Sequence, residues 1–186
     1  IEVADFNRDG KVDLLATTLG RRNRSAEEKH HGSQVVWYEN CGDAETGRWK
    51  KQTIDDQSRA ACHGHPADMD GDGDMDIVSA SESDDTIAWY ENDGAANPSW
   101  TAVDIATSAD GAYDVHVADM DGDGDLDIVS ASHEDDTIAW YENNGSQGFT
   151  PRTISTTADG AFDLYALDFD HDGDVDVLSA SLYDHE

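Results

Sequence analysis

Four copies of an acidic nine-residue segment occur in this chain of 186 residues, and each copy runs directly into a strand-like apolar stretch. The copies are DFNRDGKVD from Asp5, DMDGDGDMD from Asp68, DMDGDGDLD from Asp119 and DFDHDGDVD from Asp168. Carboxylates this close together repel one another, and a hard cation held by oxygen ligands is the usual way to offset that repulsion. The repeated segment therefore predicts four calcium-binding loops.

The four copies differ from one another only in ways that suit a set of oxygen ligands. Positions 1, 5 and 9 are always Asp, position 3 is Asn or Asp, and position 6 is always Gly, as a sharp turn requires. Position 7 is Asp in three copies and Lys in the first, which suits a position that offers only its backbone carbonyl. Positions 1, 3, 5, 7 and 9 are the candidate metal positions: Asp5, Asn7, Asp9, Lys11 and Asp13; Asp68, Asp70, Asp72, Asp74 and Asp76; Asp119, Asp121, Asp123, Asp125 and Asp127; Asp168, Asp170, Asp172, Asp174 and Asp176.

The loops are not EF-hands. An EF-hand shares the first six positions of this pattern but requires a bidentate Glu at position 12 and a helix on each side. Position 12 is Ala16, Ser79, Ser130 or Ser179, and small and β-branched residues surround it. The loops are therefore expected to connect strands.

The net charge narrows the range of partners. The chain carries 42 acidic against 11 basic side chains, a formal charge of −31. Nucleic acids and anionic membranes are bound by Lys and Arg, so neither is an expected partner. No stretch approaches the roughly 18 apolar residues of a membrane span. Millimolar calcium outside cells suits such loops, so we expect a secreted protein or another exported, calcium-rich compartment.

The chain has two cysteines, Cys41 and Cys62, which could form one disulfide or remain free. A disulfide between them is plausible in an exported protein, and it would join adjacent repeat units. Two free, buried thiols are the alternative.

Sequence similarity extends well beyond the acidic segments. Residues 67–93 and 118–144 are nearly identical, and the acidic segments begin 63, 51 and 49 residues apart. The longer first spacing reflects an insertion around residues 19–34. A period near 50 residues is typical of solenoids, propellers and arrays. In the third unit, turn residues separate four predicted strands: 112–118, 126–132, 137–143 and 149–155.

The third predicted strand, TIAWYEN, indicates how the units pack. Successive side chains of a strand point to opposite faces, so Trp140 and Tyr141 lie on different sides of the sheet. Large apolar groups on both sides require both sides to be covered. We therefore predict an all-β chain, a β-propeller of four-stranded antiparallel blades. A β-sandwich is the alternative, but it does not explain one acidic loop in each unit.

The DxDxDGxxD loops, the 50-residue units and the WYEN strands resemble the FG-GAP/VCBS class of calcium-binding β-propellers. The resemblance covers essentially the whole chain. It implies one Ca²⁺ in each loop, held by side chains at positions 1, 3, 5 and 9 and by the carbonyl at position 7. The Phe-Gly and Gly-Ala-Pro motifs behind the FG-GAP name are missing, and the most similar segments are DGAYDV and DGAFDL. Integrin-like ligand recognition is therefore not implied.

The chain is predicted to form one propeller fragment over residues 1–186, with repeat units of about 1–60, 61–110, 111–160 and 161–186. It opens on the end of a first strand and stops soon after a second strand, which makes about three and a half blades. The resemblance implies a ring of about seven blades. We expect a longer chain or a larger assembly, and two copies that complete one ring are the alternative.

Two functions are consistent with these patterns. The first is a non-catalytic calcium-binding module for adhesion or recognition, with a protein or glycan ligand on the face opposite the calcium loops. We expect the basic insertion with Arg21, Arg22 and Arg24 on that face, either as a docking loop or as a tolerated surface insertion. The second is the propeller domain of a carbohydrate-active enzyme of the polysaccharide lyase or dehydratase type. We expect His65 and His116 to be strand residues that face a channel rather than zinc ligands, because Tyr165 takes the same repeat position.

Overall fold

The computed structural model describes residues 1–20, 32–42 and 47–183, and these residues form strands, turns and loops without a helix. The strands are β1 (Glu2–Ala4), β2 (Asp13–Thr18), β3 (Gln34–Asn40), β4 (Trp49–Asp55), β5 (Ala61–Ala67), β6 (Asp76–Ser81), β7 (Thr86–Asn92), β8 (Trp100–Ala106), β9 (Ala112–Ala118), β10 (Asp127–Ser132), β11 (Thr137–Asn143), β12 (Phe149–Ser155), β13 (Ala161–Leu167) and β14 (Asp176–Ser181). Across the described ranges, no helix is long and apolar enough to cross a membrane.

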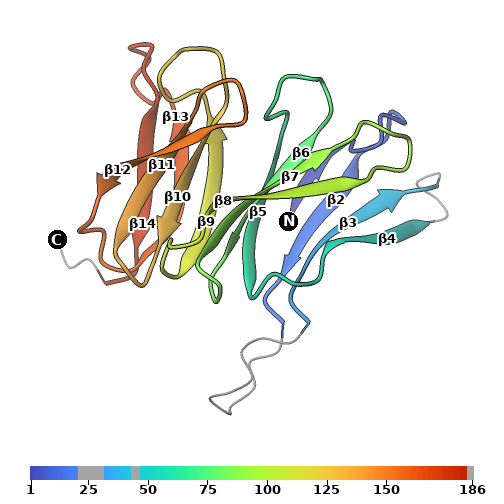
Figure 1. Cartoon of the computed structure of the whole chain (residues 1–186), viewed down its shortest axis with the longest axis horizontal. Helices are drawn as coiled ribbons and strands as arrows, with labels where there is room; N and C mark the ends of the chain where they lie inside the picture. Colours follow the sequence, from blue (N-terminus) through green and yellow to red (C-terminus); the bar gives the residue numbers. More distant parts are fainter. Residues whose placement is uncertain (21–31, 43–46, 184–186) are drawn as a thin grey trace.

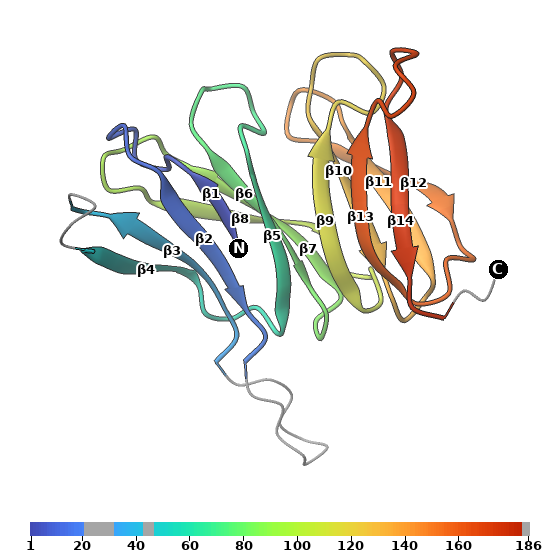
Figure 2. The same cartoon turned by 180° about the vertical axis from the view of Figure 1, so that it is seen from behind.

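The strands form four separate antiparallel sheets in sequence order. Three sheets have four strands each, β1–β4, β5–β8 and β9–β12, and the fourth pairs β13 with β14. The sheets stand side by side with the first strand of each near that of the next (Figure 1, and from behind in Figure 2). The predicted all-β class and the four-stranded antiparallel units are confirmed. Each sheet remains open.

The second strand of each inner sheet is buried on both faces. All six residues of β6 and all six of β10 are buried, although both read DIVSAS with serines at alternate positions. A strand buried on both faces carries apolar residues in succession rather than in alternation. The outermost strands β4, β8 and β12 have no buried residue, so the sheets are packed along their inner strands.

The Trp-Tyr pair of each third strand joins neighbouring sheets, as the sequence predicts. Trp89 lies in the hydrophobic cluster between the second and third sheets, which also contains Tyr141. Tyr90 points the other way, into the cluster between the first and second sheets with Trp37. β7 therefore contributes Trp89 to one intersheet core and Tyr90 to the other, and both are almost completely buried. In β11, Tyr141 lies in the core toward the second sheet and the half-buried Trp140 packs against the core toward the fourth.

The fourth sheet has one apolar face without a covering sheet among the described residues. Leu178 of β14 is 62% exposed, whereas the equivalent Val78 and Val129 are fully buried. Tyr165 and Phe169 are exposed as well. Burying a side chain of this size contributes roughly 1.5–3 kcal/mol, so an uncovered face of this kind is unfavourable in water.

Of the two alternatives for Cys41 and Cys62, the structure has free thiols rather than a disulfide, and Cys41 is exposed rather than buried. Cys41 follows β3, at the end of the sheet that carries the acidic loops, whereas Cys62 is in the first half of β5, near the other end. The intervening strand β4 of seven residues spans roughly 20 Å at about 3.3 Å per residue. A disulfide requires Cα atoms within about 7 Å, so strand direction rules the bridge out.

The basic insertion proposed as a docking loop has Arg21, Arg22 and Arg24 outside the described residues. Its two flanks are described: Thr18 closes β2, and Ser33 precedes β3. The Ser33 hydroxyl donates to the Thr18 carbonyl (2.6 Å) and accepts from the backbone N–H of Ala61 (2.8 Å). The flanks therefore join the first sheet to the second at the end opposite the acidic loops.

Candidate metal-binding loops

The four acidic segments are the loops between the first and second strand of each sheet, and all four lie at the same end of the molecule (the upper end in Figure 1). Two positions in each loop have positive φ. Position 6 is the predicted glycine, for example Gly124 with φ of 98°. Position 4 is the second, and there Arg8 and His171 adopt φ of 55° and 64° where the middle loops have glycine. The residue type at position 4 varies, so the sequence alone does not reveal that this position needs a positive φ.

The carboxylate at position 1 folds the loop around itself. One oxygen of Asp5, Asp68, Asp119 and Asp168 accepts a hydrogen bond from the glycine N–H at position 6, over 2.8 to 3.2 Å. The carboxylate at position 5 accepts in turn from the N–H of position 7, as between Asp123 Oδ1 and Asp125 N (2.9 Å). These bonds turn the side chains at positions 1 and 5 toward the inside of the loop.

In the first three loops the carboxylate at position 9 (Asp13, Asp76 and Asp127) is buried and links the loop to the sheet, whereas Asp176 of the fourth loop is exposed. Asp127 accepts from the backbone N–H of Met120 (2.8 Å) through one oxygen and from that of Asn143 (2.7 Å) through the other. Asp76 makes the same pair of bonds with Met69 and Asn92. Burial raises the pKa of Asp76 to about 6 and raises the pKa of Asp127. A nearby divalent cation would favour the charged form and oppose this shift.

Three loops gather carboxylate oxygens as a hard cation requires. One oxygen from each member of three sets lies within 4.8 Å of the others: Asp68, Asp70 and Asp72; Asp119, Asp121 and Asp127; Asp168, Asp170 and Asp176. Oδ1 of Asp68 is buried and has no hydrogen-bond partner. Calcium takes six to eight oxygen ligands at about 2.3–2.6 Å, and a loop with side chains at positions 1, 3, 5 and 9 plus a carbonyl fits this requirement.

Position 7 has its side chain turned away from the loop interior in the two middle loops. The carboxylates of Asp74 and Asp125 lie against Gly94 and Gly145, in the space that a Cβ at those glycines would take. Asp74 also pairs with Arg8 of the neighbouring loop (2.6 Å). These contacts leave the backbone carbonyl as the group that position 7 offers to a cation, as its variability suggests.

The first loop differs from the others in charge. Asn7 occupies position 3, and its Oδ1 accepts from the N–H of Asp9 (3.2 Å), as does Asp5 Oδ1 (3.1 Å). The Lys11 ammonium reaches back to Asp9 Oδ2 (2.6 Å), and this contact lowers the pKa of that carboxyl. The lysine side chain therefore neutralises a candidate ligand, a contact that position 7 alone does not reveal.

In the second and third sheets, the asparagine that ends WYEN connects its own loop to the preceding one, a role that was not predicted from the sequence. The Asn143 amide donates to Leu126 O of its own loop (3.0 Å) and to Met69 O of the loop before (3.3 Å). Asn92 bonds in the same way to Met75 O and Phe6 O, both at 2.9 Å. Its occurrence in all three WYEN strands was the only available signal, because the second partner lies 74 or more residues away.

The first strands carry a separate row of rings. His116 lies between His65 and Tyr165, with ring centroids 4.6 and 4.4 Å apart. Burial lowers the pKa of His65 to about 4. His63 pairs with Asp114, whose other oxygen accepts from Leu164 N (2.8 Å). The histidines therefore pack against the next sheet as strand residues.

The repeat geometry now has a counterpart among known protein families. The family model described as FG-GAP-like repeat matches three overlapping stretches, residues 5–79, 68–130 and 119–179, and each stretch begins with one acidic loop and ends after the next. The chain belongs to the FG-GAP-like repeat family. No curated protein matches the chain. The membership agrees with the resemblance inferred from the loops and extends over almost all of the chain.

Proposed function

We propose that this FG-GAP-like repeat chain is a calcium-stabilised β-propeller module that recognises a protein or glycan and does not catalyse a reaction. The observation that supports calcium binding is the clustering of three carboxylate oxygens within 4.8 Å in each of three loops. A bound Ca²⁺ would offset their repulsion. Positions 1, 3, 5 and 9 would supply side-chain oxygens and position 7 its carbonyl, giving one ion in each loop.

Membership of a propeller ring is the second part of this proposal. The three complete sheets have the strand order of blades, and the first strands follow one another along one side of the stack. The exposed face of β14, with Leu178 at its centre, suits a further blade packed on it. We propose that the sheets form part of a ring of about seven blades, completed within a longer chain or an assembly.

The recognition surface is proposed at the end opposite the calcium loops, and the compartment is proposed to be extracellular or otherwise rich in calcium. The loop carboxylates are engaged by backbone N–H groups, and a cation would keep them ionised, which makes them poor proton donors. The opposite end carries the turns 82–85 and 133–136, whose residues differ between repeats. Surface turns on a rigid scaffold are where recognition residues are commonly placed.

Chelation tests the calcium proposal directly. Removing calcium leaves the clustered carboxylates uncompensated, and metal binding to such loops contributes to folding free energy. A loss of a few kcal/mol lowers the Tm by about 10 °C at about 2–4 °C per kcal/mol for a domain of this size. Thermal melting with and without chelator measures the shift, and metal analysis measures the content.

Calcium should restore the original Tm, and magnesium should not, because its strict octahedral geometry suits these loops poorly. A melting curve that chelator leaves unchanged would contradict the proposal. An assay for metal-dependent turnover of polysaccharides separates the module from the enzyme alternative: turnover by the full-length protein would favour the lyase or dehydratase reading.

A further inference from the structure

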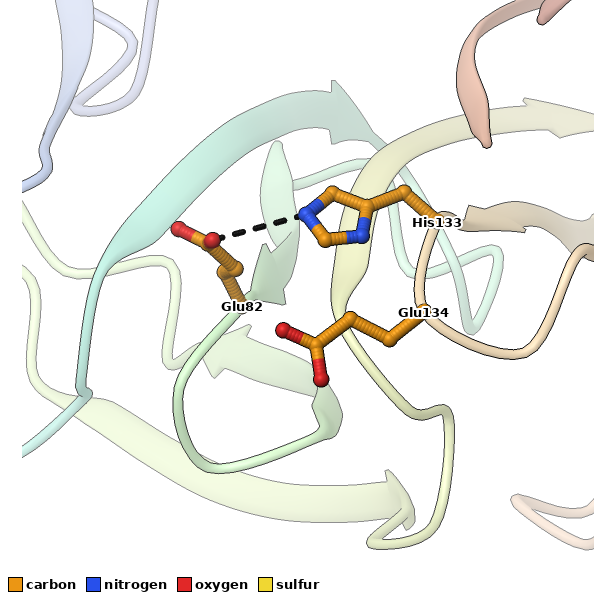
Figure 3. A group of neighbouring side chains, drawn as sticks. All are labelled: Glu82, His133 and Glu134. Carbon is orange, nitrogen blue, oxygen red and sulfur yellow. Dashed lines mark ion pairs between the residues drawn. The ribbon is translucent and has the colours of Figure 1, made fainter. Parts of the chain in front are cut away.

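Glu82, His133 and Glu134 form a group of potential metal ligands at the end of the molecule opposite the acidic loops (Figure 3). Glu82 is the first residue of the turn between β6 and β7, and the other two begin the turn between β10 and β11. The group therefore combines residues from the second and third sheets. One ligand atom from each residue lies within 4.8 Å of the other two, and Figure 3 shows the side chains converging on one space.

Backbone contacts fix where these side chains start. The N–H of Glu82 donates to Ala60 O (3.0 Å), and the N–H of His133 donates to Gly111 O (3.1 Å). Gly111 has φ of 70°, and a Cβ there would come within 2.7 Å of Glu134 Cγ. Because Gly111 has no side chain, it leaves room for the side chain of Glu134 to pass over it.

The imidazole is held in place by ring stacking. The ring of His133 stacks on that of Tyr113, with centroids 6.0 Å apart and planes 29° apart. The side chain of His133 is 24% exposed and that of Glu82 only 10% exposed. Two of the three ligands are therefore largely buried in a fixed arrangement.

The spacing of these two groups fits a metal ion better than a direct hydrogen bond. His133 Nε2 and Glu82 Oε1 are 3.5 Å apart, beyond the usual range for N–H···O bonds. Two ligands on a tetrahedral zinc at about 2.1 Å are about 3.4 Å from each other. The observed separation matches that spacing, and Glu134 is within reach as a third ligand.

We propose that Glu82, His133 and Glu134 bind a divalent transition-metal ion, with Zn²⁺ as the best candidate. An imidazole nitrogen beside two carboxylates suits zinc and its neighbours in the first transition row, whereas calcium and magnesium prefer oxygen alone. Three protein ligands leave a position for water. The site is chemically and spatially distinct from the calcium loops.

The repeat supplies an internal comparison. Leu182 and Tyr183 occupy the positions in the fourth sheet that His133 and Glu134 occupy in the third, and they make the same backbone bonds, to Gly160 O and Asp159 O. The backbone geometry of the turn is therefore shared, while the ligands occur at one of these two turns. The site is a property of the residues in HEDD and ESDD and not of the fold.

The test uses the full chain, stripped of metal and then reloaded with millimolar Ca²⁺ so that the acidic loops are occupied before zinc is added. Calorimetric titration with ZnCl₂ and metal analysis after desalting should show one tightly held Zn²⁺ per chain. His133→Gln and Glu82→Gln should each weaken zinc binding by more than about tenfold, with calcium content and Tm unchanged. Glu91→Gln and His65→Gln are the matched controls, and both should retain zinc.

Unchanged zinc affinity in the double variant Glu82→Gln/His133→Gln would overturn the proposal, and so would an equal loss in the controls. If the double variant loses calcium or melts early, X-ray absorption on the zinc-loaded wild-type protein decides. A coordination shell with one imidazole nitrogen and carboxylate oxygens supports the site. A shell of oxygen alone, or one with two or more imidazoles, contradicts it.

Discussion

At the scale of single residues, position 7 of the acidic loop separates the first loop from the other three. Its side chain turns away from the loop interior in Asp74 and Asp125, but Lys11 turns back onto Asp9. A lysine at position 7 still leaves its backbone carbonyl as a possible calcium ligand. Its ammonium, however, pairs with an Asp9 oxygen that a calcium ion would use.

We expect Lys11→Asp to tighten calcium binding at the first loop. The substitution removes the ammonium beside Asp9 and adds a carboxylate, so the local charge becomes more negative by two units. An exposed, screened site of this kind should gain roughly threefold to tenfold in affinity. Calcium titration by calorimetry measures the change. Lys51→Asp, outside the loops, is the charge-matched control, and an equal gain there would attribute the effect to net charge alone.

At the scale of strands and loops, the asparagine at the end of WYEN connects elements far apart in the chain. Asn143 is 3% exposed, and its amide donates to one carbonyl in each of two loops. Leaving a buried polar group without its partner costs about 1–3 kcal/mol. The side chain therefore contributes to the stability of both loops.

Asn143→Ala should reduce the free energy of unfolding by about 1–3 kcal/mol and weaken calcium binding at the second and third loops. Chemical denaturation in saturating calcium measures the first effect, and calcium titration the second. Asn97→Ala removes an exposed asparagine from the loop between β7 and β8 and should change neither. A stability unchanged by Asn143→Ala would show that water replaces the amide at both carbonyls.

Much of the loop and blade architecture could be predicted from the sequence because it rests on local periodicity. The period-2 pattern of TIAWYEN places Trp89 and Tyr90 on opposite faces, and both are buried there. The role of Asn143 and the meeting of Glu82 with His133 depend on how adjacent sheets align. The chain carries no local signal for that alignment, so these contacts were found only in the structure.

At the scale of the whole molecule, the two ends of the sheets are chemically different, and strand direction decides which residues share an end. Cys41 and Cys62 belong to adjacent repeat units but lie toward opposite ends of the sheets. Cys41 is exposed beside the acidic loops, whereas Cys62 is half-buried toward the far end, with Sγ 3.2 Å from Ala60 O.

Both thiols should therefore be alkylated in the native protein under non-reducing conditions, Cys41 much faster than Cys62. Mass spectrometry of the intact protein after a timed exposure to iodoacetamide counts the modified groups. Cys62→Ser should leave the rate at Cys41 unchanged. Failure to label either thiol before reduction would mean that the two are bridged after all.

Hydrogen bonds join adjacent sheets at both ends, and this has a consequence for shape. At the loop end, Asn92 and Asn143 each reach the preceding loop. At the other end, Asp85 and Asp136 accept from the N–H of Gly111 and Gly160 in the next sheet, at 3.1 and 2.9 Å. Tilting one sheet about either end would break the bonds at the other. The curvature of the stack is therefore determined by the contacts between each pair of adjacent sheets. Other repeat proteins, whose units contact only their neighbours, behave in the same way.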